Sequence, residues 1–188
     1  MEAVLQQVKE FAGEAHKGQQ RKYTPEPYIV HPVRVMEMCR SYSQELPVLA
    51  AALLHDVLED TRIDKAALTA FLNSIMIEKD ASQTADLVIE LTDVYIKERY
   101  PKWNRKKRKS KEADRIKKTS AQSQTVKYAD IIDNCREIVD HDPEFANRFL
   151  RECRDLLKCM PKGHPELYRL AIDIVNQSLE KLKNPKQQ

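Results

Sequence analysis

Residues 49–61 read Leu-Ala-Ala-Ala-Leu-Leu-His-Asp-Val-Leu-Glu-Asp-Thr, an apolar run that ends abruptly in charged side chains. Apolar residues on nearly every side of the run predict a buried helix over residues 46–60. At about 100° per residue, four polar side chains share one side of this helix: His55, Asp56, Glu59 and Asp60. Three carboxylates beside a histidine are costly in an apolar setting unless a cation or other partners neutralise them.

A divalent metal ion is one way to neutralise this cluster. Imidazole nitrogen and carboxylate oxygen are suitable ligands, so His55 and Asp56 are candidate ligands of one ion. Glu59 and Asp60 would then lie beside the ion as acid–base groups. The alternative is a helix end capped by surface charges, which is disfavoured because acidic groups near a helix C-terminus oppose its dipole.

Composition predicts helices over the rest of the chain. The 188 residues include only three glycines, which excludes a P-loop or a glycine-rich dinucleotide motif. Aromatic residues make up 6%, too few for a typical β-sandwich or barrel. We expect an all-α fold, a single helical bundle of about eight or nine helices over residues 1–183, followed by a tail at 184–188.

Apolar spacing and the positions of Pro and Gly place the individual helices. Gly18 ends the first helix, and Pro25 and Pro27 keep residues 20–30 as a loop. The expected helices are 2–19, about 32–38, 46–60, 64–76, 81–96, 102–119, 121–139, 142–158 and 165–182.

Charge is distributed unevenly along the chain. Residues 97–118 contain twelve Lys or Arg and three Asp or Glu, a local charge of +9 in a chain whose net charge is +3. Such a segment is either a solvated basic helix or a site for polyanions such as phosphates, nucleic acid or an acidic partner.

Two further features bear on the cellular location. Apolar stretches are far shorter than the roughly 20 residues needed to span a membrane, and the N-terminus lacks a signal-like pattern. The four cysteines form no CxxC pair, so we expect free thiols in a reducing compartment rather than disulfides or a zinc site. These features predict a cytoplasmic protein without a membrane partner.

Several stretches, in this order along the chain, resemble one family. Together they are similar to the hydrolase domain of the RelA/SpoT proteins and to the single-domain small alarmone hydrolases, within the HD-domain metal-dependent phosphohydrolases. The stretches are 15–22 (Ala-His-Lys-Gly-Gln-Gln-Arg-Lys), 27–32 (Pro-Tyr-Ile-Val-His-Pro), 52–61, 91–93 (Leu-Thr-Asp) and 126–134 (Val-Lys-Tyr-Ala-Asp-Ile-Ile-Asp-Asn). The resemblance covers roughly residues 3–140 and implies an HD-type helical fold.

The resemblance implies a metal site and a reaction. One manganese ion would be held by two histidines and two aspartates, which fall on His31, His55, Asp56 and Asp130. Glu59 and Asp60 fall on the family's catalytic Glu-Asp pair. The reaction would remove the 3′-pyrophosphate of guanosine tetraphosphate or pentaphosphate, giving GDP or GTP and pyrophosphate. In isolation, His31 is equally compatible with a loop or capping histidine.

Substrate contacts are also implied by the resemblance. Arg21 and Lys22 fall on the family's nucleotide-binding pair, and Asn134, one helical turn after Asp130, falls on a further site position. The alternatives are plain surface charge for the pair and an ordinary polar surface residue for Asn134. In the basic segment, the candidates for binding phosphates are Lys102, Arg105, Arg108 and Lys109.

Departures from the family pattern leave other functions open. Tyr23-Thr24-Pro25-Glu26 replaces a short Ser/Asp-Gly-type turn, and Asp133 precedes Asn134 where many long members have His. These changes allow adenine in place of guanine, and a related phosphohydrolase acting on adenine alarmones, NADPH or another nucleotide is the main alternative. A nucleic-acid-binding protein that stacks bases on Tyr100 and Trp103 is disfavoured, because no nucleic-acid-binding motif accompanies the charge.

Overall fold

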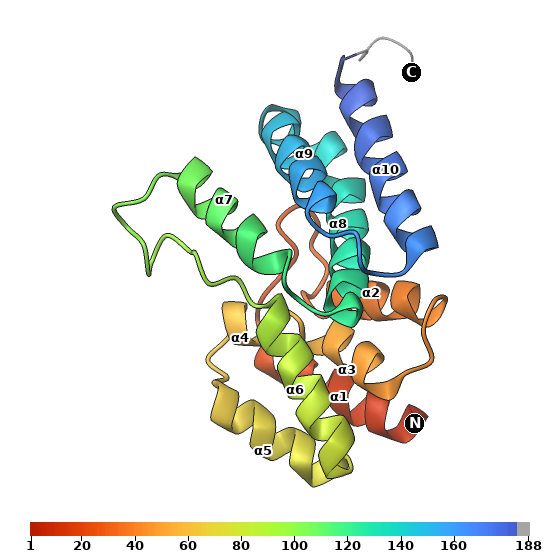
Figure 1. Cartoon of the computed structure of the whole chain (residues 1–188). Helices are drawn as coiled ribbons and strands as arrows, with labels where there is room; N and C mark the ends of the chain where they lie inside the picture. Colours follow the sequence, from red (N-terminus) through yellow and green to blue (C-terminus); the bar gives the residue numbers. More distant parts are fainter. Residues whose placement is uncertain (184–188) are drawn as a thin grey trace. The chain divides into compact units, whose positions relative to one another are not determined.

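The computed structural model describes residues 1–183 and consists of helices joined by turns and loops (Figure 1). Within this range no residue belongs to a β-strand, and Gln20 and Pro27 form an isolated antiparallel bridge. The all-α prediction is therefore confirmed. The chain divides into two compact units, Met1–Thr92 and a second that begins at Asp93. The single domain over 1–183 stays a prediction, and the expected tail at 184–188 lies outside the described residues.

The first unit is built around one buried helix. Its helices are α1 (Glu2–Ala15), α2 (Val30–Arg40), α3 (Leu46–Leu54), α4 (Val57–Asp60), α5 (Lys65–Ile75) and α6 (Glu78–Leu91). Every residue of α3 from Pro47 to Leu54 is buried, and α3 packs against α1, α2 and α6. The apolar run thus forms the centre of this unit, as predicted from its lack of a polar face.

The predicted helix over residues 46–60 is in fact two helices. A turn at His55 and Asp56 separates α3 from α4. The imidazole of His55 bonds the carbonyl oxygen of Ala52 at 2.8 Å, a side-chain bond of the kind that competes with helical hydrogen bonds. The backbone N–H of Asp60 still donates to the carbonyl oxygen of Asp56 at 2.8 Å, so the chain continues into α4 without reversing.

The second unit consists of α7 (Arg105–Ile116), α8 (Ala121–His141), α9 (Pro143–Lys158) and α10 (Pro165–Lys183). The three last helices pack against one another. Side chains cap three N-termini: Asn104 accepts from Lys107 N, Ser120 from Ser123 N and Asp142 from Phe145 N.

The turn before α10 is locked onto α8. The buried hydroxyl of Tyr128 donates to the carbonyl oxygen of Met160 and accepts from Gly163 N at 3.1 Å. A Cβ atom at position 163 would lie 2.8 Å from the backbone nitrogen of Thr125, so only glycine allows this close approach. Burial raises the pKa of Tyr128 to about 12, which keeps the hydroxyl proton in place.

Several helix ends differ from the predicted ones. The first helix ends at Ala15 instead of 19, and Gly18 follows in the turn with φ of +82°, which glycine tolerates best. The helix predicted to reach residue 96 ends at Leu91. Beyond it, the backbone N–H groups of Val94 and Tyr95 both donate to the carboxylate of Glu112 at 3.0 Å instead of continuing a helix.

No helix in the described part of the chain is long and apolar enough to cross a membrane. Three of the four free cysteines, Cys39, Cys135 and Cys153, are buried, and Cys159 is half-buried. The cytoplasmic location stays a prediction.

Candidate metal centre

His31 reaches the site from the start of α2. It is the second residue of that helix and is 1% exposed. Its backbone N–H donates to the carbonyl oxygen of Tyr28 at 3.0 Å, which ties the first turn of the helix to the preceding loop. Pro32 follows inside the first turn, where its missing N–H costs nothing. The local sequence therefore holds an imidazole at a fixed point beside α3.

His55 and Asp56 occupy the turn that ends α3. Nδ1 of His55 lies 2.8 Å from the carbonyl oxygen of Ala52, so this nitrogen carries the proton and donates it. The tautomer directs the lone pair of Nε2 outward from the backbone of α3. A ring nitrogen oriented in this way by a carbonyl partner is typical of a metal-ligating histidine.

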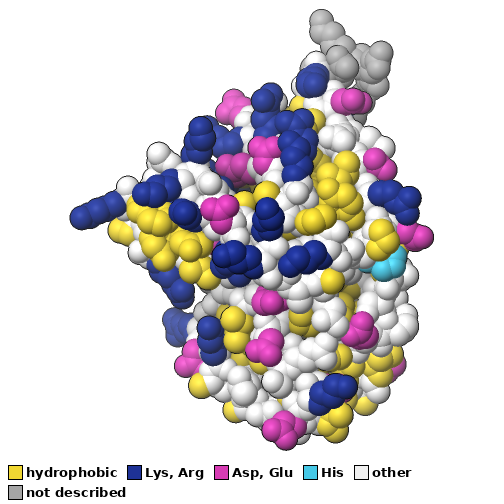
Figure 2. All heavy atoms as spheres, in the orientation of Figure 1, with side chains coloured by type: hydrophobic (Ala, Val, Ile, Leu, Met, Phe, Trp, Pro, Cys, Tyr) yellow, Lys and Arg dark blue, Asp and Glu magenta, His cyan; other side chains and the backbone are white. Residues whose placement is uncertain are grey.

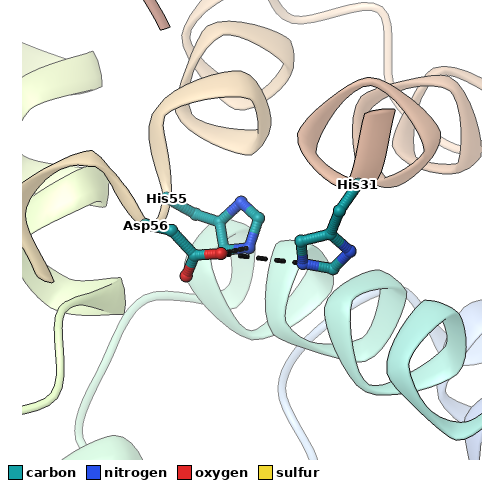
Figure 3. A group of neighbouring side chains, drawn as sticks. All are labelled: His31, His55 and Asp56. Atoms are coloured by element: carbon teal, nitrogen blue, oxygen red, sulfur yellow. Dashed lines mark ion pairs between the residues drawn. The ribbon is translucent and has the colours of Figure 1, made fainter. Parts of the chain in front are cut away.

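These three side chains converge on one point (Figure 3). Oδ2 of Asp56 is 3.0 Å from Nε2 of His55 and 3.7 Å from Nε2 of His31. One ligand atom from each residue lies within 4.8 Å of the other two. Atoms bound to one ion at 2.0–2.2 Å are at most about 4.4 Å apart, so small shifts bring the three around one ion.

The chemistry of this set fits a divalent transition metal. It combines two imidazole nitrogens with one carboxylate oxygen, and both histidines are nearly inaccessible to solvent. Mixed nitrogen and oxygen sets of this kind accept manganese, iron or zinc. A half-buried carboxylate with two imidazoles facing it is also less costly once a cation shares its charge.

The predicted acid–base pair lies one turn beyond this cluster, in α4. Glu59 and Asp60 are both exposed, and their N–H groups bond the carbonyl oxygen of Asp56. The pKa of Asp60 is raised, first by partial desolvation and then by the negative charge of Asp56, while a hydrogen bond from Tyr28 opposes the rise. Asp60 thus lies next to the histidine–aspartate cluster, and Glu59 precedes it in α4.

Arg21 and Lys22 lie in a closed loop next to the same cluster. The Gln20–Pro27 bridge closes the loop, and Arg21 N donates to Glu26 O at 3.0 Å inside it. The guanidinium carbon of Arg21 is 5.8 Å from the ring centre of Tyr28, whose hydroxyl contacts Asp56. Lys22 donates to the hydroxyl of Tyr23 at 2.9 Å.

Asp130 and Asn134 belong to α8 of the second unit and bond each other. Nδ2 of Asn134 donates to Oδ1 of Asp130 at 2.6 Å, and Nζ of Lys127 pairs with Oδ2 at 2.9 Å. Asp130 is 6% exposed. The pair shares a helix face as the four-residue spacing predicts. The role of Asp130 as a fourth ligand and that of Asn134 in substrate binding stay predictions.

Side chains of the basic segment, residues 97–118, form ion pairs and hydrogen bonds with other residues of the second unit. Arg105 pairs with Glu152, Arg108 donates to the carbonyl oxygen of Trp103, and Lys109 pairs with Asp93 at 3.2 Å. Lys102 is exposed. Figure 2 shows Lys and Arg side chains gathered, with Asp and Glu among them, where Figure 1 places α7 and α9. Three of the four predicted phosphate-binding residues thus have acidic or carbonyl partners.

The sequence motifs assigned no role to Tyr28 and His16, yet both lie in the site. The hydroxyl of Tyr28 donates to Oδ2 of Asp56 at 2.6 Å, and its ring stacks on the buried ring of His16 at 4.5 Å. Both residues belong to stretches that carry the family resemblance, at 15–22 and 27–32. Their positions in these stretches could have indicated that they belong to the site. The contacts in the structure show which side chains they touch.

Comparison with known proteins identifies relatives over most of the chain. A family model described as an HD domain matches residues 9–158. The guanosine-3′,5′-bis(diphosphate) 3′-pyrophosphohydrolase of Vibrio cholerae is 32% identical over 184 residues, which cover 95% of this chain and 23% of that protein. A probable enzyme of the same name from Synechocystis is 30% identical over 152 residues, which cover 78% and 18% of the two chains. The chain thus spans about a fifth of the length of these curated relatives.

Solved structures share the fold. One described as a metazoan orthologue of SpoT that hydrolyses ppGpp matches with a TM-score of 0.77. The match covers 94% of this chain and 97% of that chain, at 23% sequence identity. A protein of Listeria monocytogenes matches with a TM-score of 0.60 over 80% of this chain, at 19% identity. At these identities the likeness establishes a common fold.

Proposed function

This chain belongs to the HD domain family, and we propose that it is a metal-dependent hydrolase that removes the 3′-pyrophosphate of guanosine tetraphosphate or pentaphosphate. The products are GDP or GTP and pyrophosphate. One observation carries the proposal: two buried imidazoles and a carboxylate converge within 4.8 Å at the end of the central helix. The names of the relatives support the choice of substrate.

We assign His31, His55 and Asp56 as ligands of one divalent ion, with manganese as the ion to test first. Such an ion lowers the pKa of a bound water and screens the charge of the phosphate under attack. His55 contributes Nε2, because its Nδ1 proton is held by the carbonyl oxygen of Ala52. We assign Asp130 as the fourth ligand on the strength of its place in the motif at 126–134.

Glu59 and Asp60 are the proposed acid–base groups. Both follow Asp56 by about one helical turn and are exposed to solvent, so they are accessible to substrate and water. Glu59 orients the attacking water and accepts its proton, and Asp60, whose Oδ2 lies 3.3 Å from the Tyr28 hydroxyl, passes the proton onward. Glu59 and Asp60 thus share the transfer of the proton from the attacking water.

The nucleotide itself requires fixed positive charge. Arg21 offers a planar guanidinium for a base or a phosphate, and Lys22 offers a point charge from the same loop. We assign both to the nucleotide, along with Lys102 from the basic segment and Asn134 from α8. The proximity of Arg21 to Tyr28 supports the first assignment, because Tyr28 contacts Asp56.

The test is hydrolysis of guanosine tetraphosphate by the purified protein with manganese, followed by anion-exchange separation of the products. An Asp56→Ala variant is the matched control. GDP and pyrophosphate from the wild type, and neither from the control, support the proposal. Turnover of an adenine alarmone or NADPH in place of the guanine nucleotide contradicts the substrate assignment while leaving the metal centre intact.

A further inference from the structure

The hydroxyl of Tyr28 lies between two carboxylates of the site. Its oxygen is 2.6 Å from Oδ2 of Asp56 and 3.3 Å from Oδ2 of Asp60. The shorter contact makes Asp56 the main acceptor of the single hydroxyl hydrogen, and Asp60 is the weaker second acceptor. The same Oδ2 atom of Asp56 lies 3.0 Å from Nε2 of His55 and 3.7 Å from Nε2 of His31. Tyr28 therefore bonds the oxygen that faces both histidines.

The position of Tyr28 is itself fixed by several contacts. Its ring stacks on His16, with ring centres 4.5 Å apart and planes at 28°, and its backbone N–H donates to the carbonyl oxygen of Gln19 at 3.0 Å. His16 is buried, and its Nδ1 lies 2.8 Å from Oε1 of Gln19. Nε2 of Gln19 donates to the carbonyl oxygen of Asp60 at 2.7 Å. The side chain of Gln19 thus connects the surroundings of Tyr28 to α4.

Tyr28 also contacts the other half of the cluster. Its carbonyl oxygen accepts the N–H of His31 at 3.0 Å, at the start of α2. Tyr28 therefore contacts two candidate ligands. Its backbone bonds His31 in α2, and its side chain bonds Asp56 in the turn after α3. Asp56 stands in a turn between two helices, where its carboxylate has rotational freedom unless a partner holds it.

We propose that Tyr28 is a positioning residue whose hydroxyl holds the Asp56 carboxylate in the orientation that binds the metal ion. A carboxylate oxygen has two lone pairs, so Oδ2 accepts the hydroxyl with one and offers the other to the ion. The inference rests on the proposed function, because it requires a metal at His31, His55 and Asp56. Loss of such a supporting contact typically weakens metal affinity about 10- to 100-fold.

The experiment compares Tyr28→Phe with a Tyr168→Phe control. Phenylalanine retains the stack on His16 and removes only the hydroxyl, so the fold is preserved. Tyr168 is half-buried in the second unit, where its ring contacts Tyr128. Manganese is titrated into each protein without nucleotide, and free manganese is followed by electron paramagnetic resonance. We expect Tyr28→Phe to raise the Kd about 10- to 100-fold and Tyr168→Phe to leave it unchanged.

Activity measured against manganese concentration separates positioning from catalysis. If Tyr28 positions Asp56, the variant regains a kcat within about twofold of wild type once manganese saturates the site. An unchanged Kd in Tyr28→Phe overturns the inference, and an unchanged Kd with a low kcat at saturation assigns Tyr28 to the reacting groups instead. If the wild type itself binds no manganese, the proposed metal centre fails, and the role of Tyr28 fails with it.

Discussion

Arg105 and Glu152 form a two-point ion pair between the first residue of α7 and the middle of α9. Nε of Arg105 lies 2.8 Å from Oε1 of Glu152, and Nη2 lies 2.6 Å from Oε2. The guanidinium also lies over the ring of Phe145, with Cζ 5.4 Å from the ring centre. The pKa of Arg105 is raised, chiefly by the hydrogen bonds to Glu152. An arginine that the sequence marks as a phosphate contact therefore fastens two helices of the second unit together.

This pairing predicts a loss of stability when Arg105 is replaced. Because the pair is partly exposed, we expect Arg105→Gln to lower the free energy of unfolding by about 1 kcal/mol, at the upper end for surface pairs. For a chain of this size that corresponds to a fall in Tm of about 2–4 °C. Thermal unfolding measures it, with Lys106→Gln, exposed on the same helix, as the control. A raised KM for guanosine tetraphosphate with an unchanged Tm would instead support the substrate-binding role.

Metal binding is expected to stabilise the folded chain. An ion present at about 100 times its Kd adds about 2.7 kcal/mol, or roughly 5–10 °C in Tm. Asp56→Ala should abolish this rise because it removes the carboxylate that faces both histidines. Differential scanning fluorimetry with and without manganese, after dialysis against a chelator, makes the comparison. An equal rise in the wild type and the variant contradicts a metal centre at Asp56.

Asp130 is expected to contribute to the same ion. Asp130→Asn keeps the size of the side chain but removes its charge, so we expect weaker manganese binding and loss of hydrolysis. Asp140→Asn is the matched control, since Asp140 lies on the same helix, is exposed and pairs with Lys181 at 2.6 Å. Manganese titration of both variants tests the assignment. Wild-type affinity in Asp130→Asn would exclude this residue from the ligand set.

Glu59 should act on the reaction and not on metal affinity. Its carboxylate is exposed and belongs to α4, beyond the three candidate ligands. We expect Glu59→Gln to lower kcat about 10²- to 10⁴-fold, the usual contribution of a general acid or base. The Kd for manganese should stay at the wild-type value, and Glu14→Gln, on the exposed side of α1, should behave as wild type. A variant that loses manganese affinity together with kcat would make Glu59 a ligand.

The four thiols should differ sharply in reactivity. Cys39 is buried, and burial raises its pKa to about 12, so at pH 8 only about one in 10⁴ of these thiols is ionised. The pKa of Cys153 is also raised, through a hydrogen bond with Cys135 and through burial. Cys159 is half-buried. Ellman's reagent should therefore modify one thiol per native chain and four after denaturation, and rapid modification of two or more in the native protein would contradict this burial.

The local sequence was sufficient for the features that depend on neighbouring residues. The apolar run before His55 and Asp56 predicted a helix buried on all sides, because a helix without a polar face has to be covered by others. The four-residue spacing of Asp130 and Asn134 likewise predicted a shared helix face, and their 2.6 Å hydrogen bond agrees. The helix predicted over residues 142–158 likewise agrees with α9, where the side chain of Asp142 accepts from Phe145 N, three residues away.

Tertiary structure decided which distant side chains meet. Nothing local to Tyr28 indicates that its hydroxyl bonds Asp56, and nothing local to Arg105 indicates Glu152, 47 residues later. Nor did periodicity reveal that the helix breaks at His55, because the break accompanies a side-chain bond to Ala52. Periodicity and spacing indicate which face of a helix is apolar. Only the packing of the folded chain determines which other residues contact that face. Residue types therefore indicated the candidate ligands, whereas the folded chain determined how these side chains are held.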